Sequence, residues 1–313
     1  MKISFVKMHG CGNDYVYIDV INEPSIAVHM AKKTWPGVVR RMSNRHTGIG
    51  SDGVIAICPP TAQRKRQWAH VRMRMFNADG SESEMCGNGV RCVAKFAHDR
   101  LGVRGDEIKV QTGAGVVSIE YSRRSGVLHT ATVNMGKPGL RPAQSGVRIS
   151  RLSFAGVKHA YGLELGSNER IVCTGTFVSM GNPHMVLFDD ENPELFGGRA
   201  GLQNLDLARM GPLVENHPAF RNRINAHFVS RQSRSEVTMR TWERGSGATQ
   251  ACGTGACAVL VAGVTTGRLA RRALLHLPGG DLSINWERAS GTVFMTGRAE
   301  DVFEGMWDLG SRS

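Results

Sequence analysis

Hydrophobic and polar residues alternate along the first nineteen positions of the chain, in two runs separated by a glycine-rich turn. Ile3 and Phe5 in the first run, and Val16 and Ile18 in the second, recur with the period of two that is typical of half-buried β-strands. Similar short runs follow at 107–112, 116–121 and 170–180. The pattern therefore predicts a chain rich in short strands.

The pattern changes to a helical period at two places, each directly after a Cys-Gly-x-Gly sequence. Apolar residues recur at i, i+3, i+4 and i+7 behind Cys86 and again behind Cys252. The residues are Val90, Val93, Ala94 and Ala97 in the first case, and Cys257, Leu260, Val261 and Val264 in the second. Each cysteine is therefore predicted to stand at the start of a helix.

The two Cys-Gly-x-Gly sequences belong to a longer internal repeat. GNDYVYID at 12–19 is similar to GNPHMVLF at 181–188. The asparagine of each turn precedes a cysteine by a similar length of chain, 73 positions from Asn13 to Cys86 and 70 from Asn182 to Cys252. The repeat predicts two similar α/β halves related by an approximate twofold axis.

A Gly- and Pro-containing stretch at 131–142 is expected to separate these halves. The last strand, 301–309, is expected to return to the first half. We therefore assign 1–131 plus 299–313 to a first half-domain that carries Cys86, and 132–298 to a second that carries Cys252. The active site is expected in the cleft between them. Residues 151–170 are expected to form a surface hairpin with its tip at 166–168.

Composition narrows the function classes. With 313 residues, 41% hydrophobic and 21% charged, the chain has the composition of a globular protein. It has no apolar run long enough to span a membrane and no signal peptide, so we expect a soluble, cytoplasmic protein. The formal charge of +12 comes from scattered clusters without a nucleic-acid motif, which favours a solvated surface over a nucleic-acid face.

Seven cysteines are present, without a C-x-x-C pair or other spacing typical of zinc ligands. We expect reduced thiols and no metal site. Five of them are expected to be structural: Cys11, Cys58, Cys92, Cys173 and Cys257. The duplicated context sets Cys86 and Cys252 apart.

A cysteine at a helix N-terminus is expected to have a lowered pKa, and the bare backbone after it can bind a carboxylate. If two such sites face each other across a cleft, one thiolate can remove the α-proton of an amino acid. The other thiol then returns a proton on the opposite face, so the configuration inverts without a cofactor.

Seven motifs, which include the repeated sequences, together resemble the diaminopimelate epimerase family over nearly the whole chain. They are KMHGCGNDYVYID (7–19), RHTGIGSDGVI (45–55), FNADGSESEMCGNGVRC (76–92), SMGNPHMV (179–186), NRINAHFV (222–229), WERGSGATQACGTGACA (242–258) and MTGRAEDVFEGMW (295–307). The resemblance implies two halves, each a curved, mostly antiparallel sheet wrapped around a central helix. It also implies a cofactor-independent isomerase that interconverts LL- and meso-diaminopimelate in lysine and peptidoglycan precursor biosynthesis.

The same resemblance implies roles for individual residues. Cys86 and Cys252 would be the two acid/base thiols. Donors to the reacting carboxylate would be Gly87, Asn88, Gly253 and Thr254, and the residues that hold the substrate would be Asn13, Asn77, Asn182, Asn225, Glu243 and Arg244. His184 would either tune a thiol or serve as a framework residue.

The chain departs from many bacterial relatives at two positions, where Ser51 and Gly53 replace a bulky residue and a glutamine. A substrate contact from the side chain of position 53 is therefore expected to be absent. Asp14 and Asp52 are interpreted as turn formers with Asx-type hydrogen bonds.

Two other functions stay open. The first is a pyridoxal-phosphate-independent racemase of another amino acid, such as histidine or proline, on the same scaffold. The second, which leaves the paired cysteines unexplained, is a basic, non-catalytic RNA-binding protein. As partners we expect a small-molecule amino acid, no nucleic acid and no membrane, with homodimer formation left open.

Overall fold

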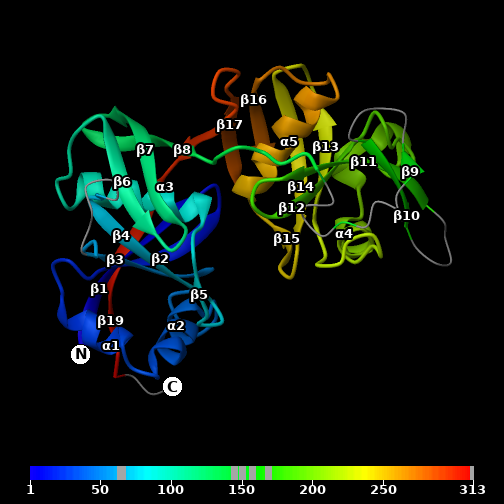
Figure 1. Ribbon diagram of the computed structural model, residues 1–313. Helices are drawn as coiled ribbons and strands as arrows, with labels where there is room; N and C mark the ends of the chain where they lie inside the picture. The colour runs from blue at the N-terminus through cyan, green and yellow to red at the C-terminus, as the bar shows by residue number, and fades with distance from the viewer. Residues whose placement is uncertain (62–67, 142–146, 148–152, 155–159, 166–170, 311–313) are drawn as a thin grey trace. The chain divides into compact units, whose positions relative to one another are not determined.

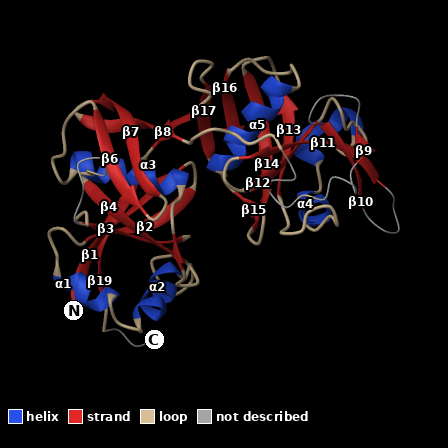
Figure 2. Cartoon of the chain, in the orientation of Figure 1, coloured by secondary structure: helices blue, strands red, loops and turns tan. Residues whose placement is uncertain are grey.

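The computed structural model describes residues 1–61, 68–141, 147, 153–154, 160–165 and 171–310. The chain divides into two compact units, Met1–Val133 with Gly297–Ser313 and Asn134–Thr296. Strands are the main regular structure of both units, with few helices (Figure 2). The expected hairpin at 151–170 is present in part as β9 and β10, and its tip at 166–168 lies outside the described residues.

The first unit is built mainly of antiparallel ladders, with β2–β3 and β4–β6 parallel (Figure 1). The C-terminal strand β19 pairs antiparallel with β1, so the end of the chain joins the sheet of its beginning. The elements are β1 (Lys2–Gly10), β2 (Asn13–Asp19), α1 (Ser25–Met30), α2 (Trp35–Ser43), β3 (Gly53–Cys58), β4 (Val71–Asn77), β5 (Glu82–Ser83), α3 (Gly87–Asp99), β6 (Glu107–Thr112), β7 (Gly115–Arg124), β8 (Val127–Asn134) and β19 (Glu300–Asp308).

The second unit repeats this order. Its β11–β12, β13–β14 and β16–β17 ladders are antiparallel, and β12–β13 and β14–β16 are parallel. The elements are β9 (Ser153–Phe154), β10 (Ala160–Leu165), β11 (Ile171–Ser179), β12 (Pro183–Phe188), η4 (Gly198–Asn204), α4 (Leu207–Glu215), β13 (Asn225–Arg231), β14 (Glu236–Glu243), β15 (Gly247–Thr249), α5 (Gly253–Thr265), β16 (Arg272–Leu277), β17 (Gly280–Trp286) and β18 (Val293–Arg298).

The repeat also holds at the level of single residues. Ile55 lies opposite Met75 in the β3–β4 ladder, as His227 lies opposite Thr241 in the β13–β14 ladder. The capping cysteine of the next helix follows eleven positions after Met75 and eleven after Thr241. Ile55 and His227 are therefore equivalent positions, as are Met75 and Thr241.

A single long helix occupies the centre of each unit. In α3 every residue from Asn88 to His98 is buried, and in α5 every residue from Gly255 to Gly263 is buried. Helix α3 packs against β1, β2, β4 and β6, and α5 packs against β11, β12, β13, β16 and β17 (Figure 1). The sequence pattern predicted one apolar face, but both helices are enclosed on all sides because the strands curve around them.

A second core lies on the other face of each sheet. In the first unit Val16 and Val54 pack with Trp35 of α2, and in the second Met185 and Phe228 pack beside α4. Because strand side chains alternate between faces, the neighbouring positions turn toward the central helix. The Tyr17 hydroxyl accordingly donates to the Gly89 carbonyl oxygen of α3 at 3.2 Å, and these inward positions form the surroundings of the two cysteines.

Candidate active site

Both cysteines are the N-cap residues of 13-residue helices. Their backbones are extended, with φ −131° and ψ 122° at Cys86 and φ −122° and ψ 106° at Cys252. The carbonyl oxygen of each accepts the first helical hydrogen bond, from Val90 and Ala256 respectively, at 2.9 Å. An extended N-cap residue turns its side chain toward the N–H groups of the first turn, where the helix carries partial positive charge. The two cysteines therefore share one backbone conformation, but only the Cys86 side chain accepts a capping hydrogen bond, from the Gly89 N–H.

The Cys86 sulfur has a donor on one side and an acceptor on the other. The backbone N–H of Gly89 donates to Sγ at 3.4 Å, and the thiol donates to Oδ1 of Asn13 at 3.2 Å. The amide nitrogen of Asn13 donates in turn to Oδ2 of Asp52 at 2.6 Å. The phenol of Tyr15, whose pKa is raised by burial and by the neighbouring Cys86, stays neutral beside the thiol. Tyr15 was not singled out from the sequence.

The interpretation of Asp14 and Asp52 as Asx-type turn formers is wrong. Arg45 donates to Oδ1 of Asp14 at 2.7 Å and to Oδ1 of Asp52 at 2.8 Å, and Lys7 lies 2.5 Å from Oδ2 of Asp14. Burial opposes ionisation of Asp14, but the hydrogen bonds from Arg45 and Lys7 leave its pKa lowered. The two carboxylates form an ion-pair network, and Asp52 fixes the amide of Asn13.

The first turn of α3 is held by Arg91, a fully buried guanidinium. Its Nη1 donates to Oδ1 of Asn88 at 2.9 Å and to the Gly87 carbonyl oxygen at 3.5 Å, and its Nη2 lies 3.5 Å from Sγ of Cys11. Arg91 therefore orients the amide of Asn88. An arginine three positions after Asn88, between the apolar residues Val90 and Val93 of the helical pattern, is the sequence signal that identifies it.

Asn77 lies at the end of β4, opposite Gly53 in the ladder with β3. Its amide nitrogen donates to Oγ of Ser81 at 3.0 Å, which turns the side chain into the following loop. A Cβ atom at position 53 would overlap the carbonyl oxygen of Phe76. The local backbone therefore demands glycine at this position, and no side chain reaches the site from it.

Around Cys252 a continuous series of polar side chains runs into the core. Sγ lies 3.6 Å from Oγ1 of Thr254, which accepts from the amide nitrogen of Asn182 at 3.4 Å. Oδ1 of Asn182 lies 2.8 Å from Nε2 of His184, and Nδ1 of His184 lies 2.8 Å from Nε2 of His227. The sequence motifs include Thr254, Asn182 and His184 but gave no role to His227.

The expectation of a lowered thiol pKa is wrong for Cys252. Burial, and then the charge of Glu243, raise the pKa of this thiol well above its usual value, against the opposing effect of the Thr254 hydroxyl and the Gly255 N–H. Burial also lowers the pKa of His184 well below its usual range and that of His227 to about 3. A protonated thiol and two neutral imidazoles are therefore the favoured forms.

Asn225 joins two turns of the second unit. Its amide nitrogen donates to the Pro183 carbonyl oxygen at 3.0 Å, and its Oδ1 accepts from the Arg244 N–H at 2.9 Å. Glu243 accepts from the Thr249 hydroxyl at 2.6 Å, and the Arg244 side chain is exposed. The structure thus brings Asn182, His184 and Asn225 together through the strand pair β12–β13, with Glu243 and Arg244 at the end of β14.

The family model described as Diaminopimelate epimerase matches residues 5–140 and 176–302. This chain belongs to the diaminopimelate epimerase family. The diaminopimelate epimerase of Desulfovibrio desulfuricans is 44% identical over 306 residues, which cover 97% of this chain and 98% of that protein. The diaminopimelate epimerase of Acetivibrio thermocellus is 42% identical with the same coverages.

Solved structures share the fold at much lower identity. A probable proline racemase from Agrobacterium radiobacter K84 has a TM-score of 0.65 at 15% identity, covering 98% of this chain and 93% of that one. A hydroxyproline epimerase from Agrobacterium vitis has a TM-score of 0.59 at 14% identity, covering 99% and 93%. These likenesses establish the epimerase-type fold that the sequence predicted.

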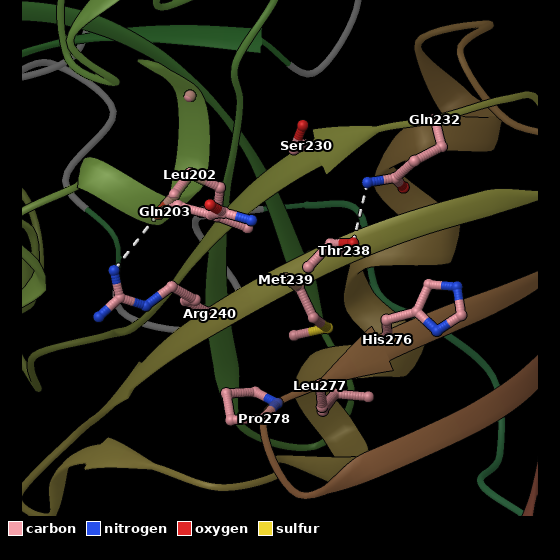
Figure 3. A pocket seen from close by; sticks show the side chains of 11 residues that line it. Leu202, Gln203, Ser230, Gln232, Thr238, Met239, Arg240, His276, Leu277 and Pro278 are labelled. Atoms are coloured by element: carbon pink, nitrogen blue, oxygen red, sulfur yellow. Dashed lines mark hydrogen bonds between the residues drawn. The ribbon is translucent and has the colours of Figure 1, made fainter.

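A cavity of about 440 Å³ in the second unit lies apart from these residues. Figure 3 shows its lining side chains on β13, β14 and β16, including Arg240 and His276, and none of the predicted site residues lines it. In the part of the chain that the structure describes, no three His, Cys, Asp or Glu side chains gather as metal ligands would. None of the described helices is long and apolar enough to cross a membrane.

Proposed function

We propose that this chain interconverts LL- and meso-diaminopimelate by exchanging the proton at one α-carbon between two cysteines. The observation that carries the proposal is the pair of N-cap cysteines, Cys86 and Cys252, at equivalent positions of two repeated units. Family membership supports the substrate, because relatives that match this chain over nearly their whole length bear the name of that enzyme.

The reaction needs one thiolate and one thiol at a time. The thiolate forms an S–H bond as the α-C–H bond breaks, and the electron pair passes into the substrate carboxylate as an enediolate. The second thiol gives its proton to the opposite face of the α-carbon and becomes the thiolate. The raised pKa of Cys252 supports its starting as the thiol, which leaves Cys86 as the first base.

The proposed substrate contacts follow the polarity of each helix start. N–H groups at Gly87, Asn88, Gly253 and Thr254 would receive the reacting carboxylate, because the first turn of a helix has N–H groups without internal partners. The substrate, including its distal ammonium and carboxylate groups, would be held by Asn13, Asn77, Asn182, Asn225, Glu243 and Arg244. Each unit carries one of the two thiols, and we propose that both thiols act on one bound substrate.

A racemase of another amino acid, such as histidine or proline, is the alternative on the same scaffold. Glu243 and Arg244 favour diaminopimelate, because they offer a carboxylate and a guanidinium to the distal amino-acid centre that proline lacks. A site built to bond that centre would reject amino acids without it. A comparison of exchange rates on these amino acids decides between the two.

Exchange of the α-hydrogen tests the function directly. The reduced protein is incubated with LL-diaminopimelate in heavy water, and NMR follows deuterium uptake and formation of the meso isomer. We expect both in the wild type, and the loss of both in Cys86→Ser and Cys252→Ser. Cys92→Ala, a change inside the same helix as Cys86, serves as the control. Folded protein without exchange would refute the proposal.

We further propose that the protein works as a homodimer in the cytoplasm, where thiols stay reduced. Strand β19 supports the dimer, because it exposes three large apolar side chains, Val302 (54%), Phe303 (46%) and Met306 (60%). Light scattering should give twice the chain mass for the wild type and the single mass for Phe303→Lys with Met306→Lys. A monomeric wild type at micromolar concentration would refute this part.

A further inference from the structure

The two capping cysteines have equivalent backbones but different interiors behind them. In the first unit one pair of inward positions below the helix holds two apolar side chains, Ile55 opposite Met75. In the second unit the same positions hold His227 and Thr241, which are 0% and 2% exposed. Burying polar groups costs free energy unless they are fully hydrogen-bonded, so a polar pair here calls for a reason.

The imidazole of His227 also leaves no room for a side chain at position 255, which is a glycine. A Cβ atom there would overlap Cε1 of His227, so the ring lies directly on the first turn of α5. At the equivalent Gly89 the nearest atom to an added Cβ is Cδ1 of Ile55, at 2.8 Å. His227 thus occupies a close, rigid position beneath the helix start that carries Cys252.

The hydrogen bonds that link Asn182, His184, His227 and Thr241 must all be donated in the same direction along this series of side chains. A neutral imidazole has one N–H, so each histidine donates on one side and accepts on the other. Asn182 turns Oδ1 toward His184, which makes Nε2 of His184 the donor and Nδ1 the acceptor. Nε2 of His227 then donates to Nδ1 of His184, and Nδ1 of His227, 3.0 Å from Oγ1 of Thr241, accepts from that hydroxyl.

The same direction of donation extends to the sulfur of Cys252, at the end of the series opposite Thr241. Because Asn182 presents Oδ1 to His184, its amide nitrogen donates to Oγ1 of Thr254. The hydroxyl hydrogen of Thr254 is then available to Sγ of Cys252, 3.6 Å away. A donor aimed at the sulfur stabilises the thiolate that forms when Cys252 gives up its proton.

We propose that His227 and Thr241 are positioning residues for the reaction. They fix His184 as the Nε2–H tautomer, fix the amide of Asn182, and so aim the Thr254 hydroxyl at Cys252. This inference rests on the proposed role of Cys252 as an acid/base group. It deepens that role by making the two thiols unequal, because the polar series behind Cys252 runs through two buried histidines, whereas Cys86 adjoins Asn13 and Tyr15.

The first test needs no substrate. It determines in which direction the hydrogen bonds from Asn182 to Thr241 are donated. Nitrogen-15 NMR of the imidazole groups distinguishes the two neutral tautomers, and the His184→Gln and His227→Gln proteins assign the signals. We expect Nε2–H for both histidines throughout pH 6–8. Nδ1–H signals for both would mean that the chain runs the other way, with the Thr254 hydroxyl turned from the sulfur, and would overturn the proposal.

The second test uses the other unit as a guide to substitution. His227→Ile installs the residue of the equivalent position 55, and Thr241→Val removes one hydroxyl at nearly constant volume. For each we expect kcat to fall roughly tenfold, the scale of one lost buried hydrogen bond, while KM changes by less than about threefold. His227→Gln, which can still donate to Nδ1 of His184, should recover most of the loss.

Thermal unfolding separates a positioning role from a structural one. A merely structural role would lower the melting temperature of His227→Ile and leave kcat per folded molecule unchanged, and that outcome would overturn the proposal. Ile55→Val is the matched control in the first unit and should leave kcat unchanged. If the wild-type protein lacks α-exchange, the proposed function fails, and the tautomer measurement still decides the direction of the chain.

Discussion

The thiol of Cys86 lies 3.2 Å from Oδ1 of Asn13, an amide whose other end is held by a carboxylate of Asp52. The carboxylate accepts from the amide nitrogen, which leaves the amide oxygen to accept from the thiol. At the equivalent place in the second unit, Asn182 turns its nitrogen toward the cysteine side and its oxygen toward His184. The same residue type therefore offers an acceptor near one thiol and a donor near the other.

Asn13→Asp should disrupt the first of these arrangements. It places a second carboxylate within 2.6 Å of Asp52 and against the Cys86 sulfur. We expect the free energy of unfolding to fall by about 2 kcal/mol and the pKa of the Cys86 thiol to rise, because like charges at this distance repel. Urea unfolding and a pH titration of the thiol measure the two effects.

Asn22→Asp is the matched control for that change. Its amide nitrogen lies 2.6 Å from Oδ2 of Asp19, but the pair is in an exposed turn. We expect a cost within about 0.5 kcal/mol, because solvent screens exposed charges. Equal losses in the free energy of unfolding at the two sites would show that the Asn13–Asp52 hydrogen bond contributes no more to stability than an exposed one.

Gly255→Ala should destabilise the second unit more than Gly89→Ala destabilises the first. The added methyl overlaps the rigid ring of His227 in one case and meets the flexible end of Ile55 in the other. We expect a loss of about 3 kcal/mol against about 1 kcal/mol for overpacking at the two sites. In the double variant Gly255→Ala, His227→Ala, more than about 1 kcal/mol should return, because the ring is gone. Additive losses in denaturant unfolding would contradict the contact.

Much of this architecture was predictable because the same motifs occur in both halves of the sequence. The repeated Cys-Gly-x-Gly and the helical period behind it predicted α3 and α5, and the repeated Gly-Asn turn predicted the strands β2 and β12. Local patterns of this kind survive in sequence because periodicity and turn chemistry act over a few residues.

Long-range electrostatics was not predictable in the same way. The helix start at Cys252 predicted a lowered pKa, yet burial and Glu243, which is nine positions earlier, raise it. The role of His227 was also hidden, since in the sequence it is one polar residue inside a buried strand. Only the register of three strands places it between His184 and Thr241.

Acid should weaken the second unit through its buried histidines. Burial lowers the pKa of His227 to about 3, below the value of about 6.5 for an unfolded histidine. The fold therefore prefers the neutral ring, and its contribution to stability is complete above pH 6.5 and lost as the pH falls toward 3. The loss is about 1.4 kcal/mol for each pH unit in that range.

The variant His227→Ile isolates this contribution. Urea unfolding at pH 7, 5.5 and 4.5 should give a steeper loss of stability for the wild type than for the variant. The carboxylates titrate in both proteins, so the difference between the two curves reports His227. Parallel curves would mean that the imidazole takes up its proton at the same pH in the fold as in the unfolded chain, so that burial does not keep it neutral.

Glu243→Gln should lower the pKa of the Cys252 thiol. Burial is the larger cause of the raised value, and the charge of Glu243 is the next. Removing that charge at constant shape leaves burial in place, so the thiol should still titrate above an ordinary cysteine but at lower pH than in the wild type. Carbon-13 NMR of the cysteine Cβ atoms follows the titration, and the Cys252→Ser protein assigns the signal.

Glu236→Gln, at the exposed far end of the same strand, should leave the Cys252 titration unchanged. A Cys252 signal that moves equally in both variants would show that the effect belongs to the net charge of the protein. A signal unmoved by Glu243→Gln would leave burial alone as the reason that this thiol holds its proton.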